Sequence, residues 1–342
     1  MKKNLAARVA MAATAIALTA GLVTGCSSDD NAAQSSASSS SSAGGFPVTI
    51  DSAVGSATIK SKPSRVVAIG WGSTDAALAL GVVPVGIQDM SSDVDDNSAI
   101  LPWDKTKLNG ATPTLIKYSS DTVPFEQIAS LHPDVILAVN SGVTAEQFQR
   151  LNEIAPTVGY PGKAWQTSWQ DQITTVGKAL GESAKADDLV SSTNALIADA
   201  KSKHPEFGGK SIVFGSGTKP DSFNLYLVGD SRVQLLKQLG FTISPDVPTT
   251  AKSFAQPTSL EKLADVKSDV LVSWFLTPAV RTSLEGNKLF QLMPAVAGHG
   301  YVALEDPELV YATSAVTVLS LPWMLDRYLP LLSAAAQGKA TA

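Results

Sequence analysis

The amino-acid sequence predicts an α/β protein of two similar lobes, each with a central parallel sheet, joined by a single long helix. From residue 65, short runs of Val, Ile and Leu alternate with helical patterns, as expected for parallel strands covered by helices on both faces. One twelve-residue segment recurs after a constant offset of 135 residues. The chain of 342 residues also exceeds the usual length of one domain.

The first lobe is predicted at residues 46–167, and its elements follow from the apolar runs. Helices are expected at 74–80, ended by Gly81 as its C-cap, and at 144–154. Strands are expected at 66–69, 82–87, 134–139 and 157–160.

The internal repeat predicts that the second lobe, residues 206–338, resembles the first. Residues 125–136 (FEQIASLHPDVI) align without a gap to 260–271 (LEKLADVKSDVL), and each copy reads as a helix, a turn with Asp, and a buried strand. Weaker echoes pair 77–81 with 236–240, and the strand entering 70–72 with 212–217. Spacings of this size indicate duplicated lobes, not a solenoid.

Residues 168–205 are predicted to form the long helix between the lobes. Apolar residues recur there at helical spacing with charged residues between them. Pro205 and the glycines that follow end the pattern, and Gly181 is an interior position where the helix could be interrupted.

The N-terminus has the pattern of an exported, lipid-anchored protein. Residues 1–25 carry positive charges followed by an apolar run too short for a comfortable membrane span. They end in VTGC, which resembles a bacterial lipobox with Cys26 as the lipidated residue. Residues 26–45 are rich in Ser, Ala and Gly and are predicted to be a flexible tether.

Composition excludes several classes of function. The net charge of −5 offers no basic face for nucleic acid. The one cysteine leaves no disulfide framework and, if lipidated, no thiol nucleophile. The sequence contains no Gly-x-Ser-x-Gly elbow, P-loop or His-Glu-x-x-His motif, and its three histidines do not pair at ligand spacing. We therefore expect neither an enzyme nor a metal site made by protein side chains.

Aromatic residues near predicted strand ends are the candidate ligand contacts. Trp71 follows the first strand and Trp274 ends a strand of the second half, while Tyr118 and Trp165 lie on loops of the first half. Arg281 lies in a polar segment, predicted as a loop, just beyond Trp274. Ligands of open α/β sheets bind beyond the carboxyl ends of strands, so these residues could line a cleft; core packing is the alternative for each aromatic ring.

Glu126 and Glu261 are the equivalent acids of the two repeat copies. Each falls near a helix N-terminus, where the helix dipole favours a negative charge. They could alternatively be acidic contact points, one per lobe, for a partner with two basic sockets.

Several segments in order along the chain resemble one family, the substrate-binding lipoproteins of iron–siderophore ABC importers, above all their actinobacterial branch. The similarity covers nearly all of residues 46–332. The segments are PSRVV (63–67), LGVVPVG (80–86), 126–139 and SLPW (320–323), with Trp103, NSGV (140–143) and IAPT (154–157).

The resemblance implies two Rossmann-like lobes joined by one long helix, the class III binding-protein fold, with a ferric siderophore in the cleft. It also implies a monomeric, membrane-anchored extracytoplasmic protein without a cofactor of its own. Glu126 and Glu261 would then dock onto arginines of an ABC permease dimer that is driven by a cytoplasmic ATPase. The scarcity of cationic residues near the predicted pocket favours a hydroxamate or mixed-type chelate.

Two alternatives remain open from the sequence. The same fold could carry haem or cobalamin, with Tyr118 or Tyr301 as the candidate axial ligand. A lipid-anchored enzyme or sensor is the other, which the missing nucleophile–base pair disfavours.

Overall fold

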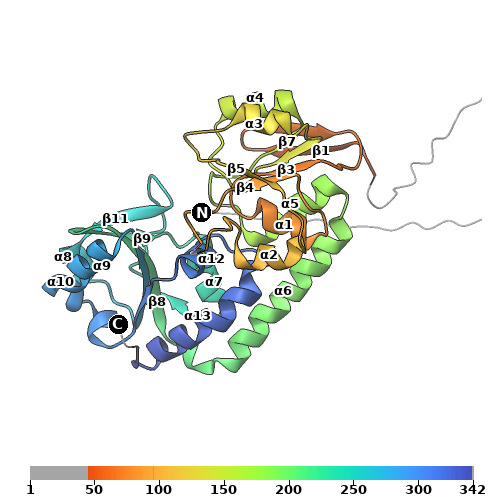
Figure 1. Cartoon of the computed structure of the whole chain (residues 1–342). Coiled ribbons are helices and arrows are strands. Elements are labelled where there is room, and N and C mark those ends of the chain that lie inside the picture. Colours follow the sequence, from red (N-terminus) through yellow and green to blue (C-terminus); the bar gives the residue numbers. More distant parts are fainter. Residues whose placement is uncertain (1–44, 95, 341–342) are drawn as a thin grey trace, which may run out of the picture. The chain divides into compact units, whose positions relative to one another are not determined.

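A computed structural model describes residues 45–94 and 96–340 of the chain (Figure 1). The predicted signal segment, the lipobox with Cys26, and all of the predicted tether except its last residue lie outside the described residues. Within the described part, no helix is both long and apolar enough to cross a membrane.

The first lobe has a five-stranded, fully parallel sheet in the order β5-β4-β3-β6-β7. A β-hairpin that the sequence analysis did not predict precedes it, formed by β1 (Val48–Ser52) and β2 (Gly55–Ile59). The strands are β3 (Val66–Ala68), β4 (Gly86–Gln88), β5 (Thr114–Ile116), β6 (Val135–Leu137) and β7 (Thr157–Val158). The helices are α1 (Ser73–Ala79), α2 (Pro102–Leu108), α3 (Phe125–Ser130) and α4 (Ala145–Ile154).

The second lobe has a six-stranded sheet in the order β11-β9-β8-β12-β13, with β10 also paired to β8. Its strands are β8 (Ser211–Lys219), β9 (Ser222–Tyr226), β10 (Thr242–Ile243), β11 (Ala255–Ser259), β12 (Val270–Phe275) and β13 (Tyr301–Leu304). β10, β8, β12 and β13 pair in parallel, whereas β9 pairs antiparallel with its two neighbours, β8 and β11. The reason for the antiparallel β8–β9 pair is the short turn at 220–221, because strands joined by so tight a connection can pair only as a hairpin.

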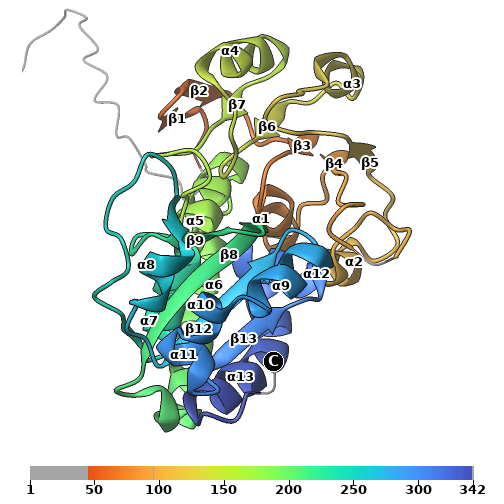
Figure 2. The ribbon, with the colours of Figure 1, turned by 90° about the vertical axis from the view of Figure 1, so that its left-hand side faces the viewer.

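Helices cover both faces of this second sheet. They are α7 (Ser231–Gln238), α8 (Leu260–Ala264), α9 (Pro278–Glu285), α10 (Lys288–Gln291), α11 (Pro294–Ala297), α12 (Pro307–Ser314) and α13 (Ser320–Ala336). Figure 2 shows α9 and α10 on the face turned to the viewer, while α7 and α13 pack on strands from the other side.

The repeat predicted from the sequence is confirmed, and its conserved spacing has a structural reason. The two copies are α3 with β6 and α8 with β12. In the first copy, the Asp134 carboxylate accepts hydrogen bonds from the Ser64 backbone N–H and hydroxyl, at 2.8 Å each. In the second, Asp269 accepts the same two bonds from Ser211, at 2.7 and 2.6 Å. Each aspartate thus holds the chain where it enters the first parallel strand of its lobe.

A single long helix joins the lobes, but it is shorter than the predicted range 168–205. That range holds two helices, α5 (Trp169–Leu180) and the 21-residue α6 (Ser183–Lys203), followed by a 3-10 turn at Pro205–Phe207. The break falls at Gly181, which has φ of 70° and ends α5 in the left-handed conformation that glycine adopts at little cost. Because α5 packs on α1 and β1, it belongs with the first lobe, and α6 alone makes the connection (Figure 1).

A buried polar contact links the lobes. Asp75 of α1 accepts a hydrogen bond from the Thr317 hydroxyl, in the segment between α12 and α13, at 2.6 Å. The Trp103 indole N–H of α2 donates to the same oxygen at 2.7 Å. One hydrophobic core cluster also contains side chains of both lobes. The lobes are therefore packed on each other as well as joined by α6.

Candidate functional site

Two neighbouring cavities mark the candidate site. The first, here called the aromatic cavity, measures about 570 Å³ and is formed by the second lobe, with Tyr226, Phe254 and Trp274 in its wall. The second, the inter-lobe cavity, measures about 380 Å³. Its wall includes Asp93 from the loop after β4, Glu305, and again Trp274. Since the Trp274 ring lines both, the two cavities adjoin across it.

Trp71 lies in the Gly70-Trp71-Gly72 turn at the carboxyl end of β3, as predicted. Its backbone N–H donates to the Asn140 carbonyl at 2.8 Å. Gly70 has φ of 75°, and a Cβ there would lie 2.8 Å from that same carbonyl oxygen, so the turn requires glycine. The Trp71 ring lies 5.0 Å from the Trp165 ring and 5.7 Å from the Tyr311 ring of α12. Trp71 of the first lobe thus contacts an aromatic side chain of the second, with Trp165 packed against Trp71.

The position of Trp165 depends on a left-handed backbone conformation at this residue. It has φ of 61°, and its backbone N–H donates to the Ser141 carbonyl at 3.3 Å. A Cβ on Gly142 would lie 2.6 Å from the indole nitrogen, so Gly142 leaves the space that the ring uses. The ring is half-buried.

Tyr118 is placed less favourably for a ligand contact than the tryptophans. It is 7% exposed and belongs to the hydrophobic core of the first lobe. Burial raises the pKa of Tyr118 to about 12. Tyr301, the other tyrosine considered as a haem ligand, is also buried, and its hydroxyl donates to Glu285 at 2.9 Å. Neither tyrosine therefore presents an open hydroxyl to the cavities.

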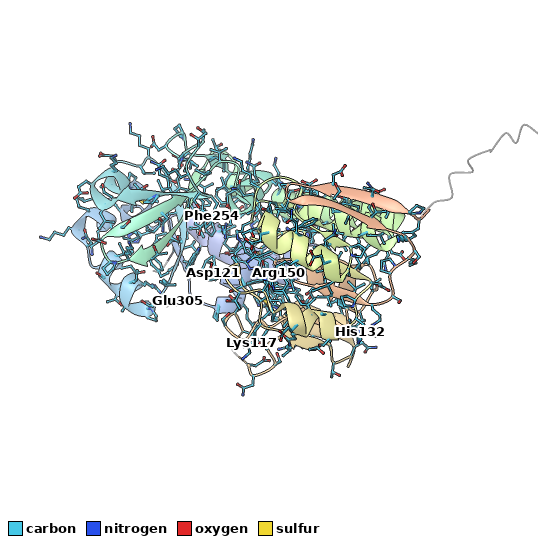
Figure 3. The ribbon with its side chains drawn as sticks, turned by 90° about the horizontal axis from the view of Figure 1, so that it is seen from above. Lys117, Asp121, His132, Arg150, Phe254 and Glu305 are labelled. Carbon is cyan, nitrogen blue, oxygen red and sulfur yellow. The ribbon has the colours of Figure 1, made fainter. Side chains whose placement is uncertain are left out.

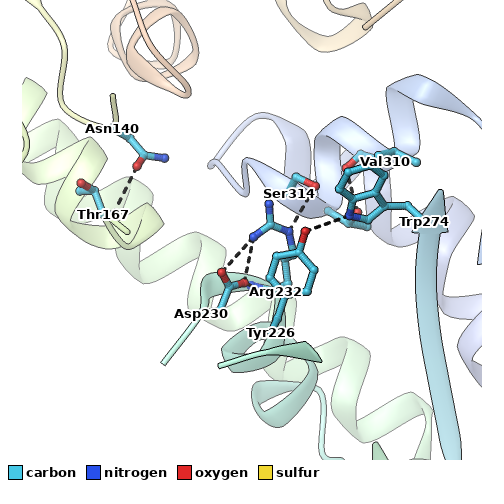
Figure 4. Close-up of polar contacts among 9 residues, drawn as sticks. Asn140, Thr167, Tyr226, Asp230, Arg232, Trp274, Val310 and Ser314 are labelled. Carbon is cyan, nitrogen blue, oxygen red and sulfur yellow. Dashed lines mark hydrogen bonds and ion pairs between the residues drawn. The ribbon is translucent and has the colours of Figure 1, made fainter. Parts of the chain in front are cut away.

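Trp274 is held by a chain of polar contacts beneath the aromatic cavity (Figure 4). Its indole N–H donates to the Tyr226 hydroxyl at 3.1 Å. The Arg232 guanidinium lies 4.4 Å from the Tyr226 ring centroid. Arg232 is in turn paired with Asp230 at 2.9 Å, and its Nε–H donates to the Ser314 hydroxyl at 3.3 Å. Buried arginine, carboxylate and hydroxyl satisfy one another here, which fixes the orientation of the Trp274 ring.

Arg281 lies beside the inter-lobe cavity but not in a loop, so that part of the prediction is wrong. It is on α9, because Thr277 caps this helix and Pro278 starts it. Its Nε–H group is paired with Glu285 at 2.7 Å, and its Nη1 atom is paired with Glu305. The guanidinium predicted to bind an anionic ligand is therefore already paired with two carboxylates of the protein.

Several wall residues were missed by the sequence analysis, although a signal existed for two. Asp93 follows β4 by a few residues and Glu305 directly follows β13. The strand-end argument that selected Trp71, applied to every strand, would have found both. Tyr226 and Phe254 carry no such signal, because an antiparallel strand and a loop present them. Figure 3 shows Phe254 and Glu305 on the second lobe, with Asp121 and Lys117 on the first.

Glu126 and Glu261 lie in the first turns of α3 and α8, as the repeat predicted, and both are exposed. Backbone N–H groups at the start of α8 lower the pKa of Glu261, and the Ser259 side chain lowers it further. Both acids are therefore available for a partner.

Comparison with known proteins identifies the family. The family model described as "Periplasmic binding protein" matches residues 66–308. A probable siderophore-binding lipoprotein of Bacillus subtilis, YfiY, is 28% identical over 242 residues, 65% of this chain and 67% of the relative.

Solved structures agree with this assignment. Streptococcus pneumoniae PiaA in complex with ferrichrome is 31% identical with a TM-score of 0.76, and the match covers 85% of this chain and 99% of that one. Staphylococcus aureus SirA complexed with staphyloferrin B is 25% identical with a TM-score of 0.66, covering 82% and 97%. The matched sequence model and the shared two-lobed fold show that this chain belongs to the periplasmic binding protein family.

Proposed function

We propose that this protein captures a ferric siderophore between its lobes and delivers it to an ABC importer. The relatives are named for siderophore binding, and two matched structures hold ferrichrome and staphyloferrin B. A siderophore supplies all the iron ligands itself. Among the described residues, no group of three or more His, Cys, Asp or Glu side chains could hold a metal ion.

The observation that carries the proposal is the position of Trp274, which lines both the aromatic cavity and the inter-lobe cavity. A ferric chelate is bulky and largely apolar on its outside. Flat, preoriented rings bury such a surface with little loss of side-chain entropy. Trp71 also contacts Trp165 of its own lobe and Tyr311 of the other, so a further group of aromatic rings lies at the junction of the lobes.

Quenching of tryptophan fluorescence during titration with ferric siderophores tests the binding role. Wild-type protein should give a saturable response to at least one chelate. Trp274→Ala should weaken that affinity at least tenfold, because the ring and its contact with Tyr226 are both lost. Trp323→Phe is the control, since Trp323 packs with Trp103 and lines a different groove. If no ferric chelate gives a saturable response, the proposal is refuted. A Soret shift on addition of haem would indicate haem as the ligand instead.

Delivery is proposed to use Glu126 and Glu261 as contacts for basic residues of a permease dimer. The double variant Glu126→Ala, Glu261→Ala should abolish uptake and leave chelate affinity unchanged. The control is Glu153→Ala with Asp326→Ala, which removes two exposed acids from α4 and α13. Reduced affinity in the first double variant would place these glutamates in ligand binding instead.

Anchoring is proposed to occur through a lipid on Cys26, on the extracytoplasmic face of the cell membrane. Cys26→Ser should leave the exported protein unlipidated and move it from the membrane fraction to the soluble one. Retention of the serine variant at the membrane would contradict lipid anchoring.

A further inference from the structure

The inter-lobe cavity has an excess of negative charge. Its charged wall residues are Asp93, Arg281 and Glu305, and Glu285 is paired with the same arginine. Two carboxylates therefore pair with the one guanidinium, and a third lines the same cavity. The rest of the wall is largely apolar, including Trp274, Phe275 and Leu276, so the acids lie at the edge of a low-polarity space.

Arg281 cannot balance this charge. Both of its ion pairs are made within the protein, one with Glu285 and one with Glu305. Glu305 nevertheless stays open to the ligand side, since its side chain is 73% exposed. A carboxylate that is paired on one side and open on the other can accept a second cation.

Asp93 is the acid of the cavity wall for which the described residues provide no ion pair. Its carboxylate accepts a hydrogen bond from the Ser92 hydroxyl at 2.7 Å, and no ion pair to it occurs among the described residues. Partial burial raises the pKa of Asp93, which is the response of a carboxylate short of water and of a cation.

The adjoining aromatic cavity differs in character. It is lined by Tyr226, Phe254 and Trp274 together with hydroxyl and amide groups, and its one charged wall residue is the exposed Lys252. The combined site therefore has an apolar part suited to a neutral metal chelate and, beyond Trp274, an acidic part suited to a cationic group.

We propose that Asp93 and Glu305 are specificity-determining residues that select ferric chelates with a protonated amine, which they receive in the inter-lobe cavity. The inference rests on the proposed siderophore role and narrows it to a neutral hydroxamate-type core carrying a positive side group. Highly anionic chelates are disfavoured by the same two carboxylates, because like charges in a partly desolvated cavity repel.

A matched pair of probes tests the inference. The ferric complex of desferrioxamine B carries one free amine, whereas the complex of its N-acetylated form has the same iron-binding core and no such charge. Wild-type protein should bind the amine form about tenfold more tightly, a typical size for two partly exposed ion pairs. The advantage should shrink as salt is added, because salt screens exposed charges.

The variants separate charge from shape. Asp93→Asn with Glu305→Gln should abolish the preference by lowering the affinity for the amine form to that for the acetylated form, and both changes keep side-chain size. Glu153→Gln removes an exposed charge on α4 and should keep the preference.

Equal binding of the two chelates by wild-type protein would overturn the inference while leaving siderophore capture intact. A preference that survives in the double variant would also overturn it. Binding of neither chelate overturns it as well, and the wider chelate panel described above then decides whether the siderophore role itself stands.

Discussion

Replacing Thr317 by valine should weaken the buried junction between the lobes. Asp75 is 1% exposed, and its Oδ1 atom accepts the Thr317 hydroxyl bond at 2.6 Å and the Trp103 indole bond at 2.7 Å. Burial raises the pKa of Asp75, while these two hydrogen bonds act to lower it. Valine has the shape of threonine, so the change removes the donor without leaving a cavity.

The magnitude follows from what the hydroxyl does. A hydrogen bond to a charged group is worth about 1.5–3 kcal/mol, and loss of a buried partner leaves the carboxylate undersolvated. The same hydroxyl oxygen accepts the backbone N–H of Ser320 at 2.9 Å, at the start of α13. Loss of that helix cap adds about 1 kcal/mol. We expect Thr317→Val to lower the free energy of unfolding by about 2–4 kcal/mol.

Urea unfolding followed by fluorescence measures this change. Thr313→Val is the baseline, because Thr313 is equally buried but donates only to the Val310 backbone carbonyl, at 3.0 Å; it should cost about 1 kcal/mol. Thr317→Ser keeps the hydroxyl and should recover most of the loss. If Thr317→Val costs no more than Thr313→Val, the buried bond does not hold the lobes and the reasoning is refuted.

Three further changes have defined outcomes. Burial raises the pKa of Asp104 well above its usual range, and the nearby charge of Asp75 raises it further, so the contribution of Asp104 to stability is full at low pH and is lost as pH rises through its native-state pKa. Asp104→Asn should therefore raise the free energy of unfolding more at pH 8 than at pH 5, and equal changes in urea titrations at the two pH values would contradict this. Hydrogen bonds from Ser211 lower the pKa of Asp269, so Asp269→Ala should lower the free energy of unfolding by about 1–2 kcal/mol at neutral pH and by much less once acid protonates the native carboxylate. An equal loss of stability at neutral and acidic pH, measured by urea unfolding, would contradict this. Gly142→Ala should displace the Trp165 ring and lower the chelate affinity measured by fluorescence quenching, whereas Gly162→Ala should not, because a Cβ there meets nothing within 4 Å. Equal affinities of the two variants would rule out a role for the Trp165 ring in ligand binding.

The strongest predictions from the sequence were those that depend on local chain chemistry. The repeat required a helix, an aspartate and a buried strand in each lobe, and α3–β6 and α8–β12 have that order. Gly81 and Gly240 end α1 and α7 at equivalent positions with positive φ, as the second echo indicated. Apolar runs and glycine stops are properties of neighbouring residues, so they can be read without knowing the fold.

The weakest predictions concerned what a side chain meets. The sequence indicated that Arg281 is an unpaired cation, but Glu285 of the same helix and Glu305 both pair with it. Glu305 lies beyond the end of β13, a separate element of the fold. Tyr118 looked like a cleft residue, but it packs in the core of its lobe. Whether a ring or charge faces a ligand depends on partners far away in the chain, which spacing along the sequence cannot specify.

By itself, the sequence determined the two α/β lobes, the presence of a helix between them and the strand ends at which Trp71 and Trp274 lie. Only the tertiary structure decided that Trp274 lines two cavities, that Trp71 contacts Tyr311 across the lobes, and that Asp93 has no ion pair among the described residues. The reason is physical: secondary structure follows from periodicity within a segment, whereas the charge and shape of a cleft depend on residues that folding brings together from distant segments.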